Sequence, residues 1–90
     1  MQTPVILPEL GLDPEQALAV SAWFAAPGDV VFEGDRLVEV LTLGATFDVP
    51  APVNGRLAAI VAYPDDSLQP GQILGWLNPG DDLLGDPEHE

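Results

Sequence analysis

The sequence predicts an all-β fold, and three observations support this prediction. Ten prolines and nine glycines among 90 residues favour frequent turns over long helices. Short apolar runs recur along the chain, each bounded by Gly, Pro, Asn or Asp, which is typical of short strands. The chain also matches itself at an offset of 37 residues, which predicts two similar half-domains.

Six apolar segments are the expected strands. The second segment is ambiguous because Ala and Leu favour helix. A Pro-Gly pair ends it, however, and Val20, Ala22 and Phe24 alternate along it, so we expect a strand there too. The expected strands lie within residues 5–7, 17–26, 37–43, 45–49, 57–63 and 73–77.

The internal match aligns turn residues and core residues in one frame. A half of about 37 residues cannot bury one face of its strands alone. Two halves packed face to face can, which predicts a small sandwich or flattened barrel with a rough two-fold axis. The matched pairs are Val20/Leu57, Ala22/Ala59, Phe24/Val61, Pro27/Pro64, Asp29/Asp66, Val31/Leu68, Gly34/Gly71, Leu37/Leu74 and Val40/Leu77.

The charge excludes two classes of partner. The chain carries 15 acidic residues, two arginines and no lysine, so its formal charge is −13. Such a charge repels phosphate backbones and anionic lipid surfaces, so we expect neither nucleic-acid nor membrane binding. The acid excess serves either solubility or a protein partner with a basic docking face. The N-terminus lacks a basic region and no 18-residue apolar run occurs, which predicts a cytoplasmic location.

The side chains offer little for catalysis or metal binding. The one histidine is His89, and the chain has two serines and no cysteine. A nucleophilic triad needs a histidine held inside the fold, and zinc needs several His or Cys ligands, so neither is expected. The acid pairs at 65–66 and 81–82 adjoin Pro or Gly, which predicts solvated turns. We therefore predict no catalytic residue and no metal site.

The chain divides into one domain and a tail. Residues 1–78 form the predicted domain, and residues 50–55 make the extended crossing between its halves because prolines disfavour a central strand there. Residues 79–90 hold five of the acids with two prolines and two glycines, so we expect a disordered acidic tail.

Several other side chains have structural interpretations. Phe24, Phe32 and Phe47 are expected in the core. Arg36 and Arg56 are expected to pair with nearby acids on the surface. The two tryptophans, Trp23 and Trp76, are expected to pack in the core or at its rim.

Three stretches together resemble a known family. Residues 38–55, VEVLTLGATFDVPAPVNG, resemble the attachment hairpin of lipoyl domains and, more loosely, of biotinyl domains. Residues 6–11, ILPELG, and 22–40, AWFAAPGDVVFEGDRLVEV, resemble two further motifs of lipoyl domains. The resemblance covers residues 4–78. It implies a flattened barrel-sandwich of two four-stranded antiparallel sheets with an internal quasi-two-fold axis, and lipoate or biotin attached to a lysine at the hairpin tip.

The chain departs from the family at that lysine. The tip reads Thr42, Leu43, Gly44, Ala45, so Gly44 occupies the attachment-lysine position and Leu43 replaces the preceding acid. Attachment joins a carboxyl group to a side-chain amine, which glycine lacks, and the guanidinium of arginine is too weak a nucleophile. We therefore expect no covalently bound lipoate or biotin.

The tip has three interpretations. Gly44 makes a tight turn and Leu43 leans on the barrel rim, or the tip contacts a protein partner, or the chain is an altered copy of a domain with lysine at 44. The tip suggests a non-catalytic binding or structural module, which the resemblance associates with a 2-oxo acid dehydrogenase or biotin-dependent complex. The alternatives are a genuine lipoyl or biotin carrier domain and a barrel that binds a ligand noncovalently.

Overall fold

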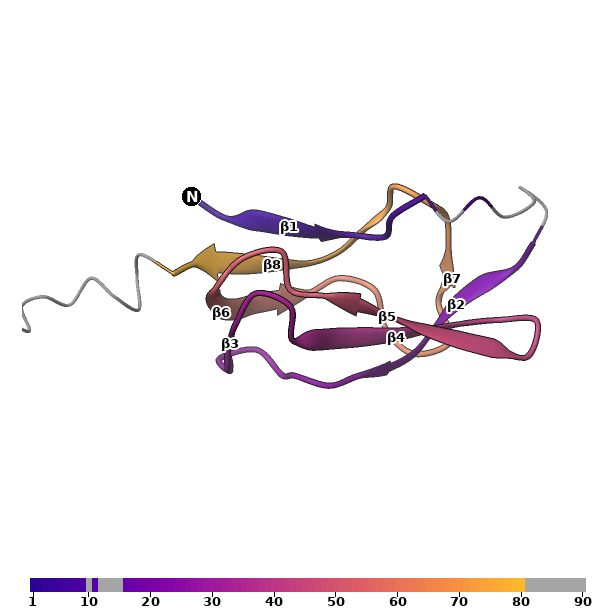
Figure 1. The fold of residues 1–90 in the computed structure, drawn as a ribbon, viewed down its shortest axis with the longest axis horizontal. Helices are drawn as coiled ribbons and strands as arrows, with labels where there is room; N and C mark the ends of the chain where they lie inside the picture. The colour runs from indigo at the N-terminus through magenta and orange to yellow at the C-terminus, as the bar shows by residue number, and fades with distance from the viewer. Residues whose placement is uncertain (10, 12–15, 81–90) are drawn as a thin grey trace, which may run out of the picture.

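The computed structural model describes residues 1–9, 11 and 16–80, and strands are the regular secondary structure in that part of the chain. Eight strands form two four-stranded antiparallel sheets (Figure 1), which confirms the predicted fold class. Among the described residues, no helix is long and apolar enough to cross a membrane. The strands are β1 (Thr3–Ile6), β2 (Leu18–Trp23), β3 (Val30–Val31), β4 (Arg36–Thr42), β5 (Ala45–Pro50), β6 (Gly55–Ile60), β7 (Ser67–Leu68) and β8 (Ile73–Pro79).

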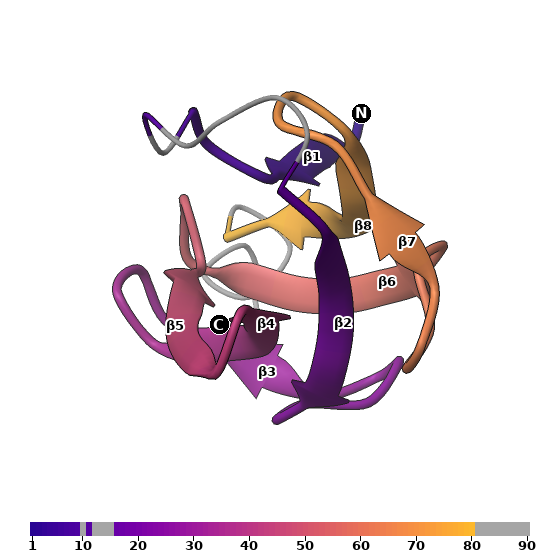
Figure 2. The ribbon, with the colours of Figure 1, turned by 90° about the vertical axis from the view of Figure 1, so that its right-hand side faces the viewer.

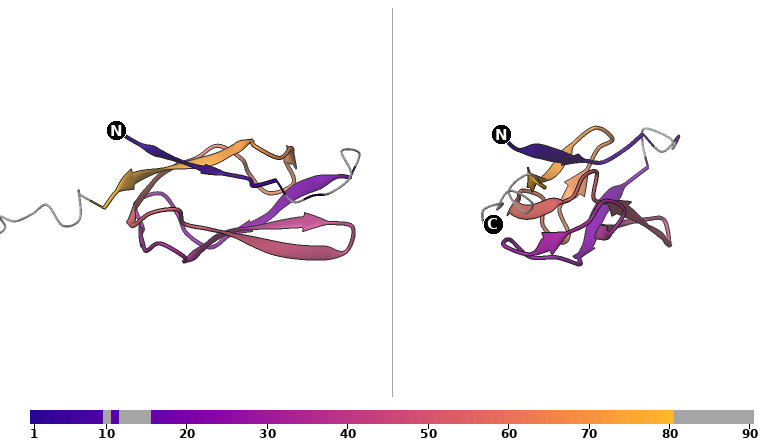
Figure 3. Two further views of the ribbon diagram at one scale, coloured as in Figure 1. Left: turned by 45° about the horizontal axis from the view of Figure 1, so that its top comes forward. Right: turned by 60° about the vertical axis from the view of Figure 1, so that its left-hand side comes forward.

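The two sheets have the same internal order. One runs β1-β8-β6-β3 and the other runs β5-β4-β2-β7. Figure 2 shows the crossing directions of β2 and β6, and Figure 3 shows β1 and β8 in one layer above β4 and β5 in the other. The β4–β5 hairpin lies at the opposite end of the molecule from the N-terminus (Figure 1).

The core lies between these sheets and is aliphatic. Along β4, Val38, Val40 and Thr42 are buried, whereas Glu39 is half-buried and Leu41 is 44% exposed, which is the alternation expected of a strand with one face in water. The core residues are Val5, Leu7, Leu18, Val20, Val31, Leu37, Val38, Val40, Val49, Ala51, Leu57, Ala62, Leu68, Leu74 and Leu77.

The predicted internal symmetry is present in the backbone. The bounds of β2 and β6, of β3 and β7, and of β4 and β8 each differ by 37 residues. A bulge interrupts the β2–β4 ladder between Val20 and Ala22, and the equivalent bulge interrupts the β6–β8 ladder between Leu57 and Ala59. Sequence analysis missed β3 and β7 because two residues are too few to make an apolar run.

The Pro-containing turns of the two halves are built alike. The Asp29 carboxylate accepts a hydrogen bond from the Ala26 amide at 2.9 Å, and the Asp66 carboxylate accepts one from the Tyr63 amide at 2.8 Å. These bonds occupy turn backbone that no strand pairs. Asp66 is thus a turn residue, as predicted for the 65–66 pair.

The aromatic residues only partly match the expectation. Phe24 and Phe32 are 44% and 56% exposed, so their assignment to the core is wrong. Both follow the end of a strand, where the inward–outward alternation that motivated the prediction no longer applies. Phe47 packs against the core, and so does Trp23, whose indole nitrogen donates to the Ala62 carbonyl at 2.8 Å.

The two arginines behave differently from each other. Arg36 forms an ion pair with Asp48 at 3.4 Å, as predicted. Arg56 donates to the backbone carbonyl of Gly28 at 2.9 Å, and among the residues that the structure describes no acid forms an ion pair with it. A backbone carbonyl competes well in this position because β6 runs beside the turn that follows β2.

The C-terminal boundary of the domain stays a prediction. β8 extends to Pro79, where it pairs with Gly55. The rest of the proposed tail, residues 81–90, lies outside the described residues, and so do the 81–82 acid pair and His89.

Candidate functional site

The β4–β5 hairpin is the part of the fold that projects. Its ladder runs from the Arg36–Pro50 pair to the Thr42–Ala45 pair, and a two-residue loop closes it. β2 pairs with β4 only as far as Leu41, so the tip extends past the neighbouring strand. The two-residue loop of the tip therefore lies beyond the last β2–β4 pair.

The loop backbone suits one of its two residues. Leu43 has φ +33° and Gly44 has φ +80°, the pair of positive values typical of a type I′ hairpin turn. Glycine adopts this backbone without strain, and an added Cβ at 44 would find nothing within 4 Å. A leucine pays a steric penalty there, and Asn, Asp or Gly are the residues that usually occupy such a position.

The four tip residues divide into one whose side chain is held and three that are exposed to water. Thr42 is 7% exposed, and its hydroxyl accepts a hydrogen bond at 3.0 Å from the side-chain amide of Gln16. Leu43 is 79% exposed, so it does not lean on the barrel rim, and Gly44 and Ala45 are exposed as well. Sequence analysis did not single out Gln16, because no spacing pattern predicts a contact across 26 residues.

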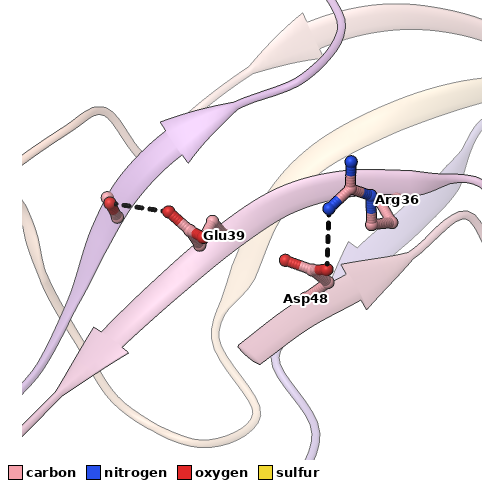
Figure 4. Close-up of polar contacts among 4 residues, drawn as sticks. Arg36, Glu39 and Asp48 are labelled. Atoms are coloured by element: carbon pink, nitrogen blue, oxygen red, sulfur yellow. Dashed lines mark hydrogen bonds and ion pairs between the residues drawn. The ribbon is translucent and has the colours of Figure 1, made fainter. Parts of the chain in front are cut away.

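Two polar contacts brace the lower part of the hairpin (Figure 4). The Ser21 hydroxyl donates to Glu39 at 3.0 Å, which ties β2 to β4, and Arg36 pairs with Asp48 at 3.4 Å, which ties β4 to β5. The same guanidinium lies 4.7 Å from the centre of the Phe24 ring. These contacts fix the base of the hairpin against its neighbouring strands, and the tip extends from that fixed base.

The described residues were compared with the donor sets that metal ions need. Residues 1–9, 11 and 16–80 contain no group of three or more His, Cys, Asp or Glu that could hold a metal ion. The tip consists of aliphatic side chains, a glycine and a threonine hydroxyl that accepts a hydrogen bond.

Two half-domains related by a quasi-two-fold axis, with one projecting hairpin, define the barrel-sandwich class of domain. Residues 3–77 match the model of the biotin/lipoyl family, whose description is "Biotin-requiring enzyme". The match covers most of the chain, and the chain belongs to this family.

The curated relatives are components of multienzyme complexes. The chain is 35% identical over 80 residues to the dihydrolipoyllysine-residue succinyltransferase component of the 2-oxoglutarate dehydrogenase complex of Bartonella vinsonii subsp. berkhoffii, a match that covers 89% of the chain and 19% of that protein. It is 33% identical over 75 residues to the lipoamide acyltransferase component of the branched-chain alpha-keto acid dehydrogenase complex of Pseudomonas putida, covering 82% of the chain and 18% of that protein. The chain thus spans about a fifth of the length of these relatives.

Solved structures agree on the fold. The lipoyl domain of the 2-oxoglutarate dehydrogenase complex from Azotobacter vinelandii matches with a TM-score of 0.67 and 25% identity, covering 84% of the chain and 96% of that domain. A single-chain long-chain acyl-CoA carboxylase matches with a TM-score of 0.70 over 98% of the chain and 8% of its own length. The second match has 15% identity and speaks for the fold alone.

The tip residues do not fit a group carried on a lysine. None of Thr42, Leu43, Gly44 and Ala45 bears an amine, and the 90 residues contain no lysine. Arg36 lies at the far end of β4, six residues from Thr42, or about 20 Å at the usual rise per residue.

Proposed function

We propose that this domain is a non-carrier member of its family that binds a protein partner through the hairpin tip, Thr42 to Ala45. The observation that supports the proposal is Leu43, which combines an exposed aliphatic side chain with a left-handed backbone conformation. On both counts an asparagine or glycine would suit the isolated domain better. A residue that breaks two local rules without benefit to the fold indicates a function.

The tip can supply binding energy of useful size. Burying a leucine side chain in a partner's apolar pocket contributes about 1.5–3 kcal/mol before the costs of association. Leu41, 44% exposed, adds a second aliphatic group two residues before Leu43. The ladder that holds the hairpin lowers the ordering cost, because the tip needs little rearrangement on binding.

We propose a component of a 2-oxo acid dehydrogenase or biotin-dependent complex as the partner. The support is the set of relatives, of which the two described above are acyltransferase components of 2-oxo acid dehydrogenase complexes. With a net charge of −13, this chain would approach a basic face most readily. In this proposal the domain is a binding or structural module and not itself an enzyme.

Two substitutions at one position test the tip. Leu43→Glu places a charge in the proposed contact, and Leu43→Asn removes the aliphatic group while relieving the backbone strain. In calorimetric titrations with complex components from the same genome, both variants are expected to lose about tenfold or more in affinity. Leu43→Asn is also expected to melt at a higher temperature than the parent. Unchanged affinity in both variants contradicts the proposal.

A mass measurement separates this proposal from the carrier alternative, which family membership favours. After co-expression with a lipoate ligase and a biotin ligase, the intact mass is expected to equal the sequence mass. An added lipoyl or biotinyl group would establish a carrier. Leu43→Asp combined with Gly44→Lys restores an amine and is expected to make the domain a ligase substrate; no modification would mean that the hairpin geometry itself has diverged.

A further inference from the structure

The surface hollow beside β3 contains features that the fold does not require. The hollow measures about 370 Å³, and its lining includes Phe24, Val30, Asp29, Asp35 and Arg36. It sits at the base of β4, which is the end of the strand opposite the hairpin tip. It is therefore a different surface from the one that the tip would use.

The internal symmetry provides a control for those residues of the hollow that differ between the two halves. The second half builds the same backbone with Val61 in place of Phe24, Ser67 in place of Val30 and Ile73 in place of Arg36. The fold thus works without the aromatic ring and without the guanidinium. Both groups are particular to the first half. Arg36 ties β4 to β5 through Asp48, whereas the backbone that the halves share does not require the half-exposed Phe24 ring.

Asp35 provides the clearest case. Its carboxylate accepts a hydrogen bond from the Phe32 amide at 2.9 Å, and the amide oxygen of Gln72 accepts the equivalent bond from the Gln69 amide at 2.9 Å. A neutral glutamine therefore does the structural work equally well. The negative charge at position 35 is an addition that the turn does not demand.

The hollow combines apolar surface with negative charge. Phe24 and Val30 are 44% and 42% exposed, and Phe32 in the adjoining turn is 56% exposed. Asp29 and Asp35 line the hollow together with Arg36, and Asp48 pairs with Arg36, so these three carboxylates and one guanidinium leave a net charge of −2. Arg36 is itself engaged by Asp48 and by the Phe24 ring.

We propose that this hollow, defined by Phe24, Val30, Asp29 and Asp35, is a second docking surface that takes a basic segment of a protein partner. Charge complementarity selects the occupant, because a cationic side chain can reach the carboxylates while its aliphatic stem lies on Phe24. The net charge of −13 attracts such a segment from a distance. This inference does not depend on the hairpin, and a domain with both surfaces would bridge two partner elements.

The test uses the full 90-residue chain, labelled with 15N, and three synthetic decapeptides. Leucine alternates with arginine in the first, with glutamine in the second and with glutamate in the third. The arginine peptide is expected to shift the amide resonances of residues 24–36 and to bind at least about tenfold more tightly than the other two. Equal binding of the three peptides, or shifts centred elsewhere, would overturn the proposal.

Two variants borrow residues from the second half, so each is compatible with the local backbone. Phe24→Val removes the ring, and Asp35→Gln removes the charge while keeping the turn hydrogen bond. Each substitution is expected to lower the affinity for the arginine peptide about tenfold. The controls are Tyr63→Ala, which removes an exposed aromatic from the other half, and Glu9→Gln, which removes one charge outside the hollow. Both controls are expected to bind like the parent.

The variants also separate this surface from the hairpin. Leu43→Glu is expected to leave the peptide-induced shifts at residues 24–36 unchanged. If Leu43→Glu abolishes them, the peptide binds at the tip and the second surface is rejected. If Phe24→Val and Asp35→Gln bind like the parent, the hollow is rejected while the hairpin proposal stands.

Discussion

The two halves of the domain, residues 18–42 and 55–79, share a backbone and differ at the surface. Each half has three strands in the same positions, with the same bulge and the same pair of turns. Residues that recur at the 37-residue offset, such as Leu37 and Leu74, are those that the fold needs. Residues that differ across the offset, such as Phe24 and Val61, are open to other uses.

The hairpin is where the symmetry ends. β4 continues directly through the tip into β5, whereas β8, its counterpart, ends at Pro79 and pairs with β1 from the other end of the chain. The tip loop therefore occurs once, and no second copy shows what its sequence would be without a function. The tip loop can be compared only with the residue preferences of such turns, and by that comparison Leu43 is unusual.

The largest effects are expected from the paired core leucines. Leu37 and Leu74 are both 0% exposed and occupy equivalent sites. Each change to alanine is expected to lower the free energy of unfolding by about 3 kcal/mol, because it removes buried contacts and leaves a cavity. Urea denaturation followed by tryptophan fluorescence measures both. Losses that differ by more than about twofold would show that the halves do not contribute equally to the core.

Intermediate effects are expected at the turn carboxylates. Asp29→Ala and Asp66→Ala each remove the acceptor of one backbone amide, which is expected to cost about 1 kcal/mol. The conservative changes to asparagine keep an acceptor oxygen and serve as the controls. If alanine and asparagine prove equally costly at one site, the hydrogen bond there is not the reason for the repeated aspartate.

The smallest effects are expected at the residue between Pro and Asp in the two equivalent turns. Gly28 has φ +100°, and its counterpart Asp65 has φ +75°, where a side chain is strained. Asp65→Gly is therefore expected to raise the free energy of unfolding by about 0.5 kcal/mol, and Gly28→Asp to lower it by a similar amount. Thermal melts of the two variants check the signs. A stabilising Gly28→Asp would contradict the strain argument.

Much of the fold follows from local pattern. The apolar runs at residues 37–43 and 73–77, bounded by turn residues, predicted the two long strands, and the Pro-x-Asp and Gly turns shared at the 37-residue offset predicted the repeat. The strands β3 and β7 were not predicted. They exist because β3 pairs with β6 and β7 pairs with β2, and a two-residue segment carries no sequence pattern that predicts such pairing. The assignment of Phe24 and Phe32 to the core was wrong for a related reason. The exposure of a residue just past a strand end depends on which other segment of the chain packs over it.

The candidate sites divide in the same way. The lack of an attachment amine could be inferred from the sequence, because position 44 is glycine, the chain has no lysine, and amide formation requires an amine in any fold. The left-handed backbone of Leu43 and the hollow beside β3 could not be inferred from the sequence, because both depend on how chain segments meet in space.

The sequence by itself determined the all-β class, the repeat of two halves, the charge and the missing acceptor amine, since each depends on residue type and spacing along the chain. Only the tertiary structure decided which apolar side chains remain outside, that the hairpin tip extends past its neighbouring strand, and that Phe24, Asp29 and Asp35 share one hollow. Burial and proximity are properties of packed surfaces, and packing brings together residues that the chain order keeps apart.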